Sequence, residues 1–274
     1  MINFAITCAP EPLRSEKYFM ITQLQSLALG IIEGFTEFLP ISSTAHLVLG
    51  ASLLNIPQSN FVKTFEIAIQ SGAVLAVVFF YFKKLLEWNM LKKIAVAFMP
   101  TGIIGMLLYT FVKSYVLGNI VVVLWSLAVG GVLLIIFEYA HKEKMAADAV
   151  EHISYRQAVY IGFFQSLAIV PGVSRAAATI VGGMLVGISR KTIVEFSFLL
   201  AVPTMLAATA LDLLNSYRQF TAAQFDTLAI GFFASFVTAM ASIIFLLRYI
   251  RRHSFVGFGV YRILLVLAFT LAVL

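Results

Sequence analysis

Two acidic residues, Glu33 and Glu37, lie four positions apart inside a strongly apolar stretch of the chain, residues 21–54. On a helix this spacing places both carboxylates on one face, where they repel each other. The pair is costly in an apolar environment unless a cation or an arginine offsets the charges. Mg²⁺ typically binds one or two protein carboxylates and fills its other positions with water and phosphate oxygens. The pair therefore predicts a divalent metal site, the alternative being two acids that face water.

Three hydroxyl side chains and a histidine follow directly, since Ser42, Ser43, Thr44 and His46 come just after Pro40. Proline ends a helix or begins one, so we expect these residues at a break where a second helix starts. The start of a helix binds anions through its free N–H groups and its dipole. Simple capping explains one hydroxyl well and three less well. His46 lies about one turn after Ser43, close enough to contact it or a phosphate bound to it.

A single strongly basic residue, Arg175, stands in the middle of a second apolar stretch, residues 157–189, within the run PGVSRAAAT. An arginine in such a segment faces the protein interior and is a candidate functional residue. Its planar guanidinium binds phosphate through two parallel hydrogen bonds. A structural ion pair with Glu33 or Glu37 is the alternative interpretation, and the two roles are compatible.

Carboxylates, hydroxyls, a histidine and an arginine together are suited to phosphoryl transfer. A metal and an arginine neutralise phosphate oxygens, a hydroxyl is the nucleophile, and a second group is the base. The sequence contains no P-loop, GxGxxG, CxxC or HExxH motif. Because these residues lie within apolar segments, we expect a lipid-linked phosphate as the substrate.

The composition indicates which elements position these residues. The chain has 274 residues, of which 61% are hydrophobic and 12% charged, whereas soluble domains average about 45–50% and about 25%. A disulfide scaffold is excluded by the single cysteine, and disorder is excluded by the hydrophobicity. We therefore predict an all-α polytopic membrane protein. The net charge of +6 does not indicate nucleic acid, because it reflects a bias of positive charge toward the cytoplasmic side.

Six stretches of low charge are long enough to cross the hydrocarbon layer. The predicted transmembrane helices cover residues 65–82, 94–112, 119–140, 192–214, 226–247 and 256–274. Residues 21–54 and 157–189 differ, because polar residues and prolines divide each into halves too short to span. Broken backbone at membrane depth survives only inside protein or along a wet cavity. Both stretches are therefore predicted to be re-entrant helix–loop–helix hairpins.

The distribution of positive charge orients the chain. The connection between the first two spans contains four lysines and is therefore predicted to be cytoplasmic: Lys83, Lys84, Lys92 and Lys93. Arg248, Arg251 and Arg252 place the last connection in the cytoplasm too. The first hairpin then opens to the outside and the second to the inside. If the second hairpin crossed the membrane once instead of returning, every later connection would change sides. Arg262, within the last apolar segment, is expected to extend its charged end toward the membrane surface.

The two hairpins resemble each other at an offset of about 130 residues, and three spans follow each one, which predicts an inverted-topology repeat. We expect a single membrane domain over residues 1–274. Residues 1–20 form an external tail, residues 21–140 the first repeat and residues 156–274 the second. The two broken tips are expected to meet near the middle of the membrane.

Three motifs resemble those of the undecaprenyl-diphosphate phosphatase family of the bacitracin-resistance type. They are EGFTEFLPISSTAH at 33–46, PGVSR at 171–175 and EFSFLLAVP at 195–203, and the resemblance extends over residues 21–274. It implies hydrolysis of undecaprenyl diphosphate to undecaprenyl phosphate and inorganic phosphate. This reaction recycles the carrier lipid for cell-envelope synthesis and confers bacitracin resistance. It also implies an inverted-repeat fold in the bacterial inner membrane, with the active site facing the periplasm.

The resemblance also implies roles for individual residues. Glu33 and Glu37 match the acids associated with a divalent metal, Mg²⁺ or Ca²⁺, and Ser43 matches the nucleophile. The residues expected around the diphosphate are Ser42, Thr44, His46, Ser174, Arg175 and Thr179. The sequence departs from the family pattern at Ala45, where many members have glycine, and at residues 176–177, where many have serine and glycine. Alanine restricts the backbone more than glycine does, and the contact of a hydroxyl at position 176 is lost.

The mechanism expected from these residues is an in-line attack of Ser43 on the terminal phosphate held by Arg175, with Glu37 or His46 as the base. Water then hydrolyses the phosphoserine. The competing function is a polyprenyl-phosphate flippase, because inverted repeats with broken helices are typical of transporters. The partners expected are undecaprenyl diphosphate and the lipid bilayer, a homodimer is left open, and nucleic acid is excluded.

Overall fold

The computed structural model describes residues 21–57, 59–115, 119–141, 149–216 and 222–273, and the predicted tail at 1–20 lies outside them. Within this part of the chain all regular structure is helical, which confirms the all-α prediction. The first five helices are α1 Gln23–Thr36, α2 Ser43–Leu53, α3 Asn60–Leu85, α4 Trp88–Tyr115 and α5 Ile120–Ala140. The second five are α6 Tyr155–Ser166, α7 Arg175–Leu185, α8 Arg190–Ser216, α9 Ala222–Tyr249 and α10 Val256–Val273.

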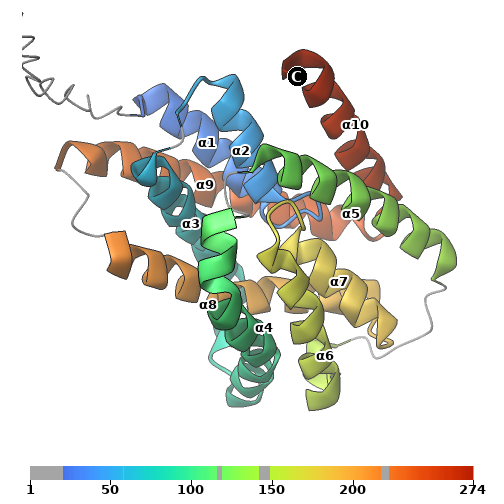
Figure 1. Cartoon of the computed structure of the whole chain (residues 1–274). Coiled ribbons are helices and arrows are strands. Elements are labelled where there is room, and N and C mark those ends of the chain that lie inside the picture. Colours follow the sequence, from blue (N-terminus) through green and yellow to red (C-terminus); the bar gives the residue numbers. More distant parts are fainter. Residues whose placement is uncertain (1–20, 58, 116–118, 142–148, 217–221, 274) are drawn as a thin grey trace, which may run out of the picture.

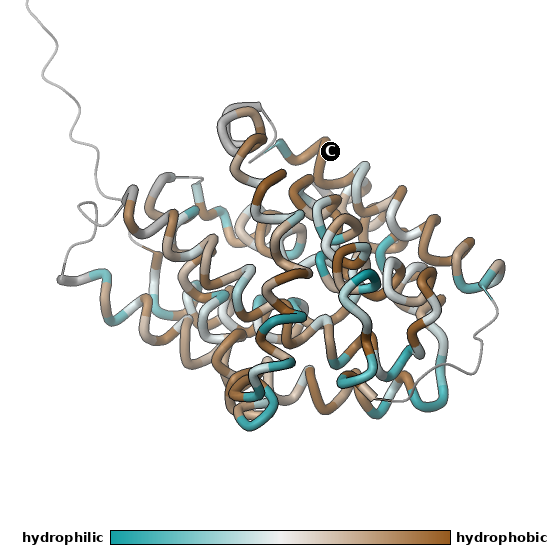
Figure 2. Tube along the Cα trace, turned by 90° about the horizontal axis from the view of Figure 1, so that it is seen from below, coloured by the Kyte–Doolittle hydropathy of each residue, from teal (hydrophilic) through white to brown (hydrophobic). Residues whose placement is uncertain are grey.

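Five helices are long and apolar enough to cross a membrane. Their apolar stretches are Phe61–Leu85, Trp88–Leu108, Ile120–Ala140, Arg190–Leu211 and Gln224–Tyr249. They correspond to five of the six predicted spans. The sixth corresponds to α10, an apolar but shorter helix. In Figure 2 the hydrophobic residues run along the helices, and hydrophilic residues gather in the connections and at helix ends.

The two predicted hairpins are pairs of short helices closed by the same local device. Thr22 caps α1 in a capping box with Gln25, and Ser154 caps α6 in a capping box with Gln157. Each glutamine then donates its side-chain N–H to a carbonyl 29 residues later, at Leu54 and at Val186. The start of each hairpin is thereby tied to its end, which holds the two short helices together.

The breaks between the short helices have different causes. In the first hairpin the chain turns through residues 37–42, where Ser42 has a positive φ of 70°. In the second, a 3-10 turn at Leu167–Ile169 is followed by Gly172, which has a φ of 93°. A Cβ atom on Gly172 would lie 2.7 Å from the carbonyl oxygen of Val123, so only glycine fits this turn.

Each hairpin packs along a long helix of the other half of the chain. The first short helix, α1, lies along α9, and α6 lies along α4 (Figure 1). Glycines permit both contacts, because a Cβ atom on Gly30 would lie 2.4 Å from the Gly231 oxygen and one on Gly162 2.1 Å from the Ala97 oxygen. The helices α3 and α8 pack against each other, as do α5 and α10. The two halves therefore interlock around both tips.

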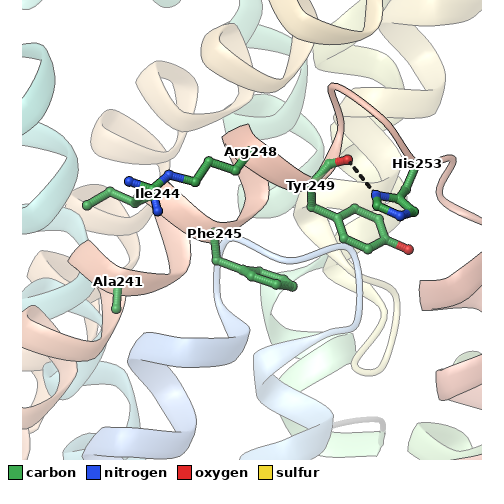
Figure 3. Close-up of a pocket in the computed structure, with 6 residues that line it drawn as sticks. All are labelled: Ala241, Ile244, Phe245, Arg248, Tyr249 and His253. Atoms are coloured by element: carbon green, nitrogen blue, oxygen red, sulfur yellow. Dashed lines mark hydrogen bonds between the residues drawn. The ribbon is translucent and has the colours of Figure 1, made fainter.

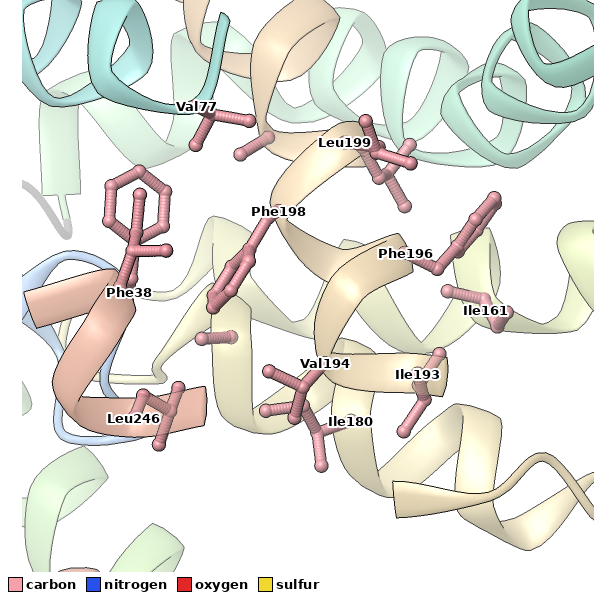
Figure 4. Close-up of a cluster of buried hydrophobic side chains, with 14 of the residues drawn as sticks. Phe38, Val77, Ile161, Ile180, Ile193, Val194, Phe196, Phe198, Leu199 and Leu246 are labelled. Atoms are coloured by element: carbon pink, nitrogen blue, oxygen red, sulfur yellow. The ribbon is translucent and has the colours of Figure 1, made fainter. Parts of the chain in front are cut away.

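The main hydrophobic core lies directly behind the first tip (Figure 4). Phe38, which follows Glu37, is fully buried and meets the ring of Phe198 on α8 edge to face, with the centroids 5.3 Å apart. Val77 and Leu199 belong to the same cluster. Close packing of this kind leaves core side chains little free space in which to move. The carboxylate of Glu37 is therefore carried by backbone that the core holds in place.

Candidate active site

An ion pair joins the two hairpin tips. The guanidinium Nη2 of Arg175, the first residue of α7, lies 3.0 Å from the Oε1 oxygen of Glu37. Arg175 also donates from Nη1 to the backbone carbonyl of Ser197 on α8, at 2.8 Å. Both side chains of the pair are largely buried. The alternative of an ion pair with one of the two glutamates is confirmed for Glu37, and the arginine is held in one orientation.

The hydroxyl of Ser43 donates a hydrogen bond to Oε2, the other carboxylate oxygen of Glu37. Ser43 is the first residue of α2, so the predicted helix start after the break is confirmed. Ser42 occupies the capping position, but its side chain makes no capping hydrogen bond. Thr44 is half-buried beside them. Glu37 therefore contacts the serine with one oxygen and the arginine with the other, the contact that a nucleophile and its base require.

Glu33 carries a fully buried carboxylate, and neither oxygen accepts a hydrogen bond from any described residue. The charged groups close enough to act on it are Glu37, Glu66 and Arg175. A buried carboxylate without donors is strongly disfavoured unless a cation or a proton compensates it. No group of three His, Cys, Asp or Glu side chains converges among the described residues. Two carboxylates suit a cation that takes its remaining ligands from water and phosphate.

His46 is held by both of its ring nitrogens. Nδ1 lies 2.7 Å from the backbone carbonyl of Ser42, and Nε2 lies 2.9 Å from the hydroxyl of Tyr261 on α10. Because a carbonyl only accepts hydrogen bonds, Nδ1 carries a proton. The two rings are stacked with an interplanar angle of 2° and centroids 5.6 Å apart. With both nitrogens engaged in this way, His46 is directed at the tip backbone and at α10 and not at the Ser43 hydroxyl.

The remaining residues of the second motif lie behind Arg175. Ser174 caps α7 by accepting a hydrogen bond from the Ala177 N–H at 3.1 Å. Thr179 is fully buried, and its hydroxyl lies 2.6 Å from that of Ser197. Since Ser197 also provides the carbonyl that holds Arg175, Thr179 acts on the arginine indirectly. The roles of Ser174 and Thr179 in contacting diphosphate stay predictions.

Comparison with known proteins identifies the family of the chain. The family described as bacitracin resistance protein BacA matches residues 26–268. The chain belongs to this family. An undecaprenyl-diphosphatase of Sulfurihydrogenibium sp. strain YO3AOP1 is 50% identical over 246 residues, 89% of this chain and 97% of that protein. An undecaprenyl-diphosphatase of Aquifex aeolicus is 49% identical over 251 residues, 91% of this chain and 98% of that protein. One of Wolinella succinogenes is 45% identical over 246 residues, 89% of this chain and 95% of that protein.

Two residues of this BacA-family chain that sequence reasoning did not assign to the site contact both tips. Tyr261 binds His46, and the neighbouring Arg262 donates from Nη2 to the carbonyl of Gly172, at 2.9 Å. The expectation that Arg262 extends to the membrane surface is wrong, because the side chain is only 1% exposed. Gly130 leaves room for it, since a Cβ atom there would lie 2.5 Å from the guanidinium. The signal was an arginine in an apolar segment, the same signal that identified Arg175.

The second tip has no acidic counterpart of Glu33. Gln165 occupies the corresponding place on α6, and its amide donates to the hydroxyls of Thr101 and Thr204, at 2.9 and 3.2 Å. The side-chain oxygen of Gln165 accepts no hydrogen bond from the described residues, but a neutral amide carries no negative charge and is not a base at ordinary pH. The acidic groups of the two tips therefore come from the first hairpin and the arginine from the second, which makes one composite site of the two.

Proposed function

We propose that this chain is an undecaprenyl-diphosphatase, which hydrolyses undecaprenyl diphosphate to undecaprenyl phosphate and inorganic phosphate and thereby confers bacitracin resistance. The family membership and the names of the relatives support the substrate. The single observation that carries the chemistry is the contact of Glu37 with both the Ser43 hydroxyl and the Arg175 guanidinium. The proposed nucleophile, Ser43, and the proposed phosphate-binding group, Arg175, thereby both contact the proposed base, Glu37.

In the proposed reaction the oxygen of Ser43 attacks the terminal phosphorus of the diphosphate. Glu37 takes the hydroxyl proton, because Ser43 already donates to it. The bond from the terminal phosphorus to the bridging oxygen breaks, undecaprenyl phosphate leaves, and a phosphoserine forms. Glu37 passes the proton to the departing undecaprenyl phosphate, which restores its carboxylate. The carboxylate then deprotonates a water molecule, whose oxygen attacks the phosphorus of the phosphoserine. The bond from this phosphorus to the serine oxygen breaks, inorganic phosphate leaves, and Glu37 returns the proton to the Ser43 oxygen. Arg175 binds the oxygens of the transferred group, on which charge accumulates.

The role proposed for His46 is positioning. Its Nδ1–H donates to the Ser42 carbonyl directly before the nucleophile, and its Nε2 is bound by Tyr261. These two contacts fix the backbone of the turn from which α2 begins. Between the two bases that the sequence left open for Ser43, this arrangement favours Glu37. Ser42 and Thr44 remain proposed substrate contacts beside the nucleophile.

Glu33 and Glu37 would hold a divalent cation, Mg²⁺ or Ca²⁺. The support is the buried carboxylate of Glu33, which has no donor among the described residues. A bound cation would neutralise diphosphate oxygens and orient them, as it does in other phosphoryl-transfer sites. The residues of the chain then bind and orient the substrate, hold the proton at Glu37, and exclude bulk water behind the packed ring of Phe38.

The arrangement proposed in the bacterial inner membrane has six crossings and two re-entrant hairpins in an inverted repeat, with the site open to the periplasm. The support is the reciprocal packing, in which α1 lies along α9 and α6 along α4. The matched capping boxes at Thr22 and Ser154 also support a repeat of the two halves. The polyprenyl tail of the substrate would lie in the bilayer, against the apolar outer faces of the helices.

A polyprenyl-phosphate flippase is the competing function, and the reciprocal packing of the two halves is typical of transporters. Transport requires no nucleophile, so the bond from Ser43 to Glu37 favours hydrolysis. The deciding experiment measures release of inorganic phosphate from undecaprenyl diphosphate by the purified chain in detergent, before and after addition of EDTA. We expect release that EDTA abolishes and that excess Mg²⁺ or Ca²⁺ restores. Absence of release in the presence of either metal would contradict the phosphatase proposal.

A further inference from the structure

A hydrophobic groove of about 600 Å³ lies on the second half of α9, beside the turn of the first hairpin (Figure 3). It is lined by Ala241, Ile244, Phe245, Arg248, Tyr249 and His253. Its walls are therefore apolar over one part and cationic or polar over the other. None of these residues takes part in the site formed by Glu37, Ser43 and Arg175.

The groove exists because the first hairpin covers only half of α9. Along the covered half, Gly34 of α1 packs against the backbone of Ser235, and the carbonyl of Phe35 accepts a hydrogen bond from Ser242 at 2.7 Å. The helix α1 ends at Thr36, where the chain turns back toward α2. The ring of Phe35 lies 6.3 Å from that of Phe245 and marks the end of the cover. Beyond it the face of α9 that continues to Tyr249 has no helix from this hairpin against it.

Polar groups lie at two places along the groove, because the Arg248 guanidinium is directed toward Ile244 whereas Tyr249 and His253 lie together on the other side (Figure 3). The guanidinium of Arg248, the hydroxyl of Tyr249 and the Nε2 atom of His253 make no hydrogen bond or ion pair with any described residue. The ring of His253 is held over that of Tyr249, with the centroids 4.6 Å apart. Arg251 and Arg252 are exposed next to them. Because the Nδ1–H of His253 donates to the carbonyl of Tyr249, its Nε2 atom is an acceptor. The positive charge of this region therefore comes from the three arginines.

Glu138, an acidic residue close to the end of α9, does not neutralise this region. Glu138 is paired with Arg190 at 2.9 Å, and it also accepts the N–H of Phe255 at 2.8 Å. Both of its oxygens are therefore occupied by other donors. The cluster of positive charge at the end of α9 remains without an acidic partner in the part of the chain that the structure describes.

We propose that this groove binds one anionic phospholipid of the cytoplasmic leaflet. An acyl chain lies along Ala241, Ile244 and Phe245, and the phosphate diester receives hydrogen bonds from the guanidinium of Arg248. Ile244 of the apolar wall and Arg248 are one helical turn, about 5–6 Å, apart. One lipid molecule can therefore contact both residues. The end of α9 is the end that the distribution of positive charge predicts to be cytoplasmic, where anionic lipids attract basic residues.

The apolar wall of the groove favours a lipid as the ligand, and the positive charge beside it favours an anionic headgroup. A soluble anion would use the donors but leave the apolar wall of Ala241 and Phe245 without a partner. A zwitterionic lipid would fill the wall, but its own positive group would be repelled by Arg248 and the neighbouring arginines. An anionic phospholipid satisfies both the apolar wall and the positive charge. It also fills the space beneath the first hairpin, next to Phe35.

Native mass spectrometry of the purified full chain, titrated with phosphatidylglycerol and with phosphatidylcholine, tests the proposal. We expect the wild type to bind phosphatidylglycerol at least about fivefold more tightly than phosphatidylcholine. Arg248→Gln should weaken phosphatidylglycerol binding about fivefold, the effect of one arginine near an anionic headgroup. Ala241→Trp should weaken it to a similar extent, because Ala241 is exposed and the indole would fill the apolar wall.

Two matched variants separate the groove from the rest of the surface. Lys92→Gln removes an exposed positive charge on α4, and Val237→Trp adds an indole at an exposed position of α9 outside the groove. Both should bind phosphatidylglycerol like the wild type. Equal binding of the two lipids by the wild type would overturn the proposal. So would losses in Lys92→Gln and Val237→Trp as large as those in Arg248→Gln and Ala241→Trp.

Discussion

Glu37 concentrates three requirements of phosphoryl transfer on one side chain. Glu37 accepts a hydrogen bond from the Ser43 hydroxyl and forms an ion pair with Arg175. It also lies close enough to Glu33 for the two carboxylates to repel each other. The Arg175 guanidinium places a positive charge directly beside the buried Glu37 carboxylate. Glu33 lacks such a partner, so the two acids four residues apart have different environments. This difference favours Glu37 as the proposed base, while both carboxylates remain the proposed cation ligands.

Replacement of the proposed nucleophile should stop turnover without unfolding the protein. We expect Ser43→Ala to lower phosphate release from undecaprenyl diphosphate at least about a thousandfold, since nucleophile removal has effects of this order or larger. Ser52→Ala provides the matched control, because Ser52 lies on the same helix and is exposed. Its rate should remain within about twofold of wild type. A Ser43→Ala rate near that of wild type would exclude Ser43 as the nucleophile.

The guanidinium geometry of Arg175 should matter more than its charge. Arg175→Lys keeps a positive charge near Glu37, but a lysine cannot bond Ser197 and a phosphate in two fixed directions. We expect kcat/KM for the diphosphate to fall at least about a hundredfold, the effect of losing one oriented donor to the transferred group.

A second buried arginine controls for the loss of packing. Arg190 pairs with Glu138 at 2.9 Å outside the site, and Arg190→Lys should leave kcat/KM within a few fold. If Arg175→Lys were equally mild, the arginine would have only the structural ion pair with Glu37, and the proposed phosphate contact would be lost.

At the scale of the elements, much of the site could be predicted from the sequence. Pro40 and the polar run after it marked the break, and Ser43 does begin a helix. Glu33 and Glu37 are on one helical face, and Arg175 does pair across the tips. Each of these features follows from local spacing and from the cost of charge in an apolar segment.

The contribution of α10 could not be predicted in the same way. Tyr261 lies in a continuous apolar helix, and nothing local indicates that its hydroxyl meets His46 across 215 positions of the chain. Arg262 was assigned to the membrane surface because long side chains near a span end usually reach water. The outcome depends on the space left by Gly130 on α5, which is a property of helix packing and not of local sequence.

We expect Arg262 to position the tip of the second hairpin and to contribute little to the stability of the fold. It is buried without an acidic partner among the described residues, and it donates to the carbonyls of Gly172 and Ser126. Replacing an unpaired buried charge with an apolar side chain is often neutral or stabilising. We expect Arg262→Met to lower kcat about tenfold, because the second tip loses its anchor, while the unfolding temperature stays at or above that of wild type.

The exposed Arg251 provides the comparison for Arg262. Arg251→Met should change neither kcat nor the unfolding temperature. An Arg262→Met enzyme with wild-type kcat would show that the contact with Gly172 does not position the tip. A parallel fall in kcat and unfolding temperature would assign Arg262 a purely structural role.

The contact of α1 with α9 should tolerate no side chain at Gly34. A Cβ atom there would lie 2.1 Å from the carbonyl oxygen of Ser235, so alanine must push α1 away from α9. We expect Gly34→Ala to destabilise the protein by about 1–3 kcal/mol, as overpacking does, and to reduce phosphate release because Glu33 moves with the helix. Gly105→Ala meets nothing within 4 Å and should be neutral or slightly stabilising. Unfolding temperature and phosphate release, measured together, test both.

For the molecule as a whole, the proposed function depends on two hairpins whose tips meet. The first contributes Glu33, Glu37 and Ser43, and the second contributes Arg175. Neither hairpin has a complete site, since Gln165 replaces the acid in the second. In the proposed inverted repeat this division follows from the topology, because each tip can be supplied only by its own half of the chain. The orientation of both halves is therefore the property on which the proposed periplasmic site depends.

Cysteine labelling in intact bacterial cells tests this orientation. After the single native cysteine, Cys8, is replaced with serine, cysteines are introduced one at a time at exposed positions, as Lys63→Cys, Lys92→Cys and Arg251→Cys. A membrane-impermeant maleimide should label Lys63→Cys in intact cells, and the other two only after permeabilisation. Lys92 precedes the second hairpin and reports the inside in either topology, whereas Arg251 follows it. Labelling of Arg251→Cys from outside would mean that the second hairpin crosses the membrane once, and Arg175 would then reach the tip of the first hairpin without the inverted repeat.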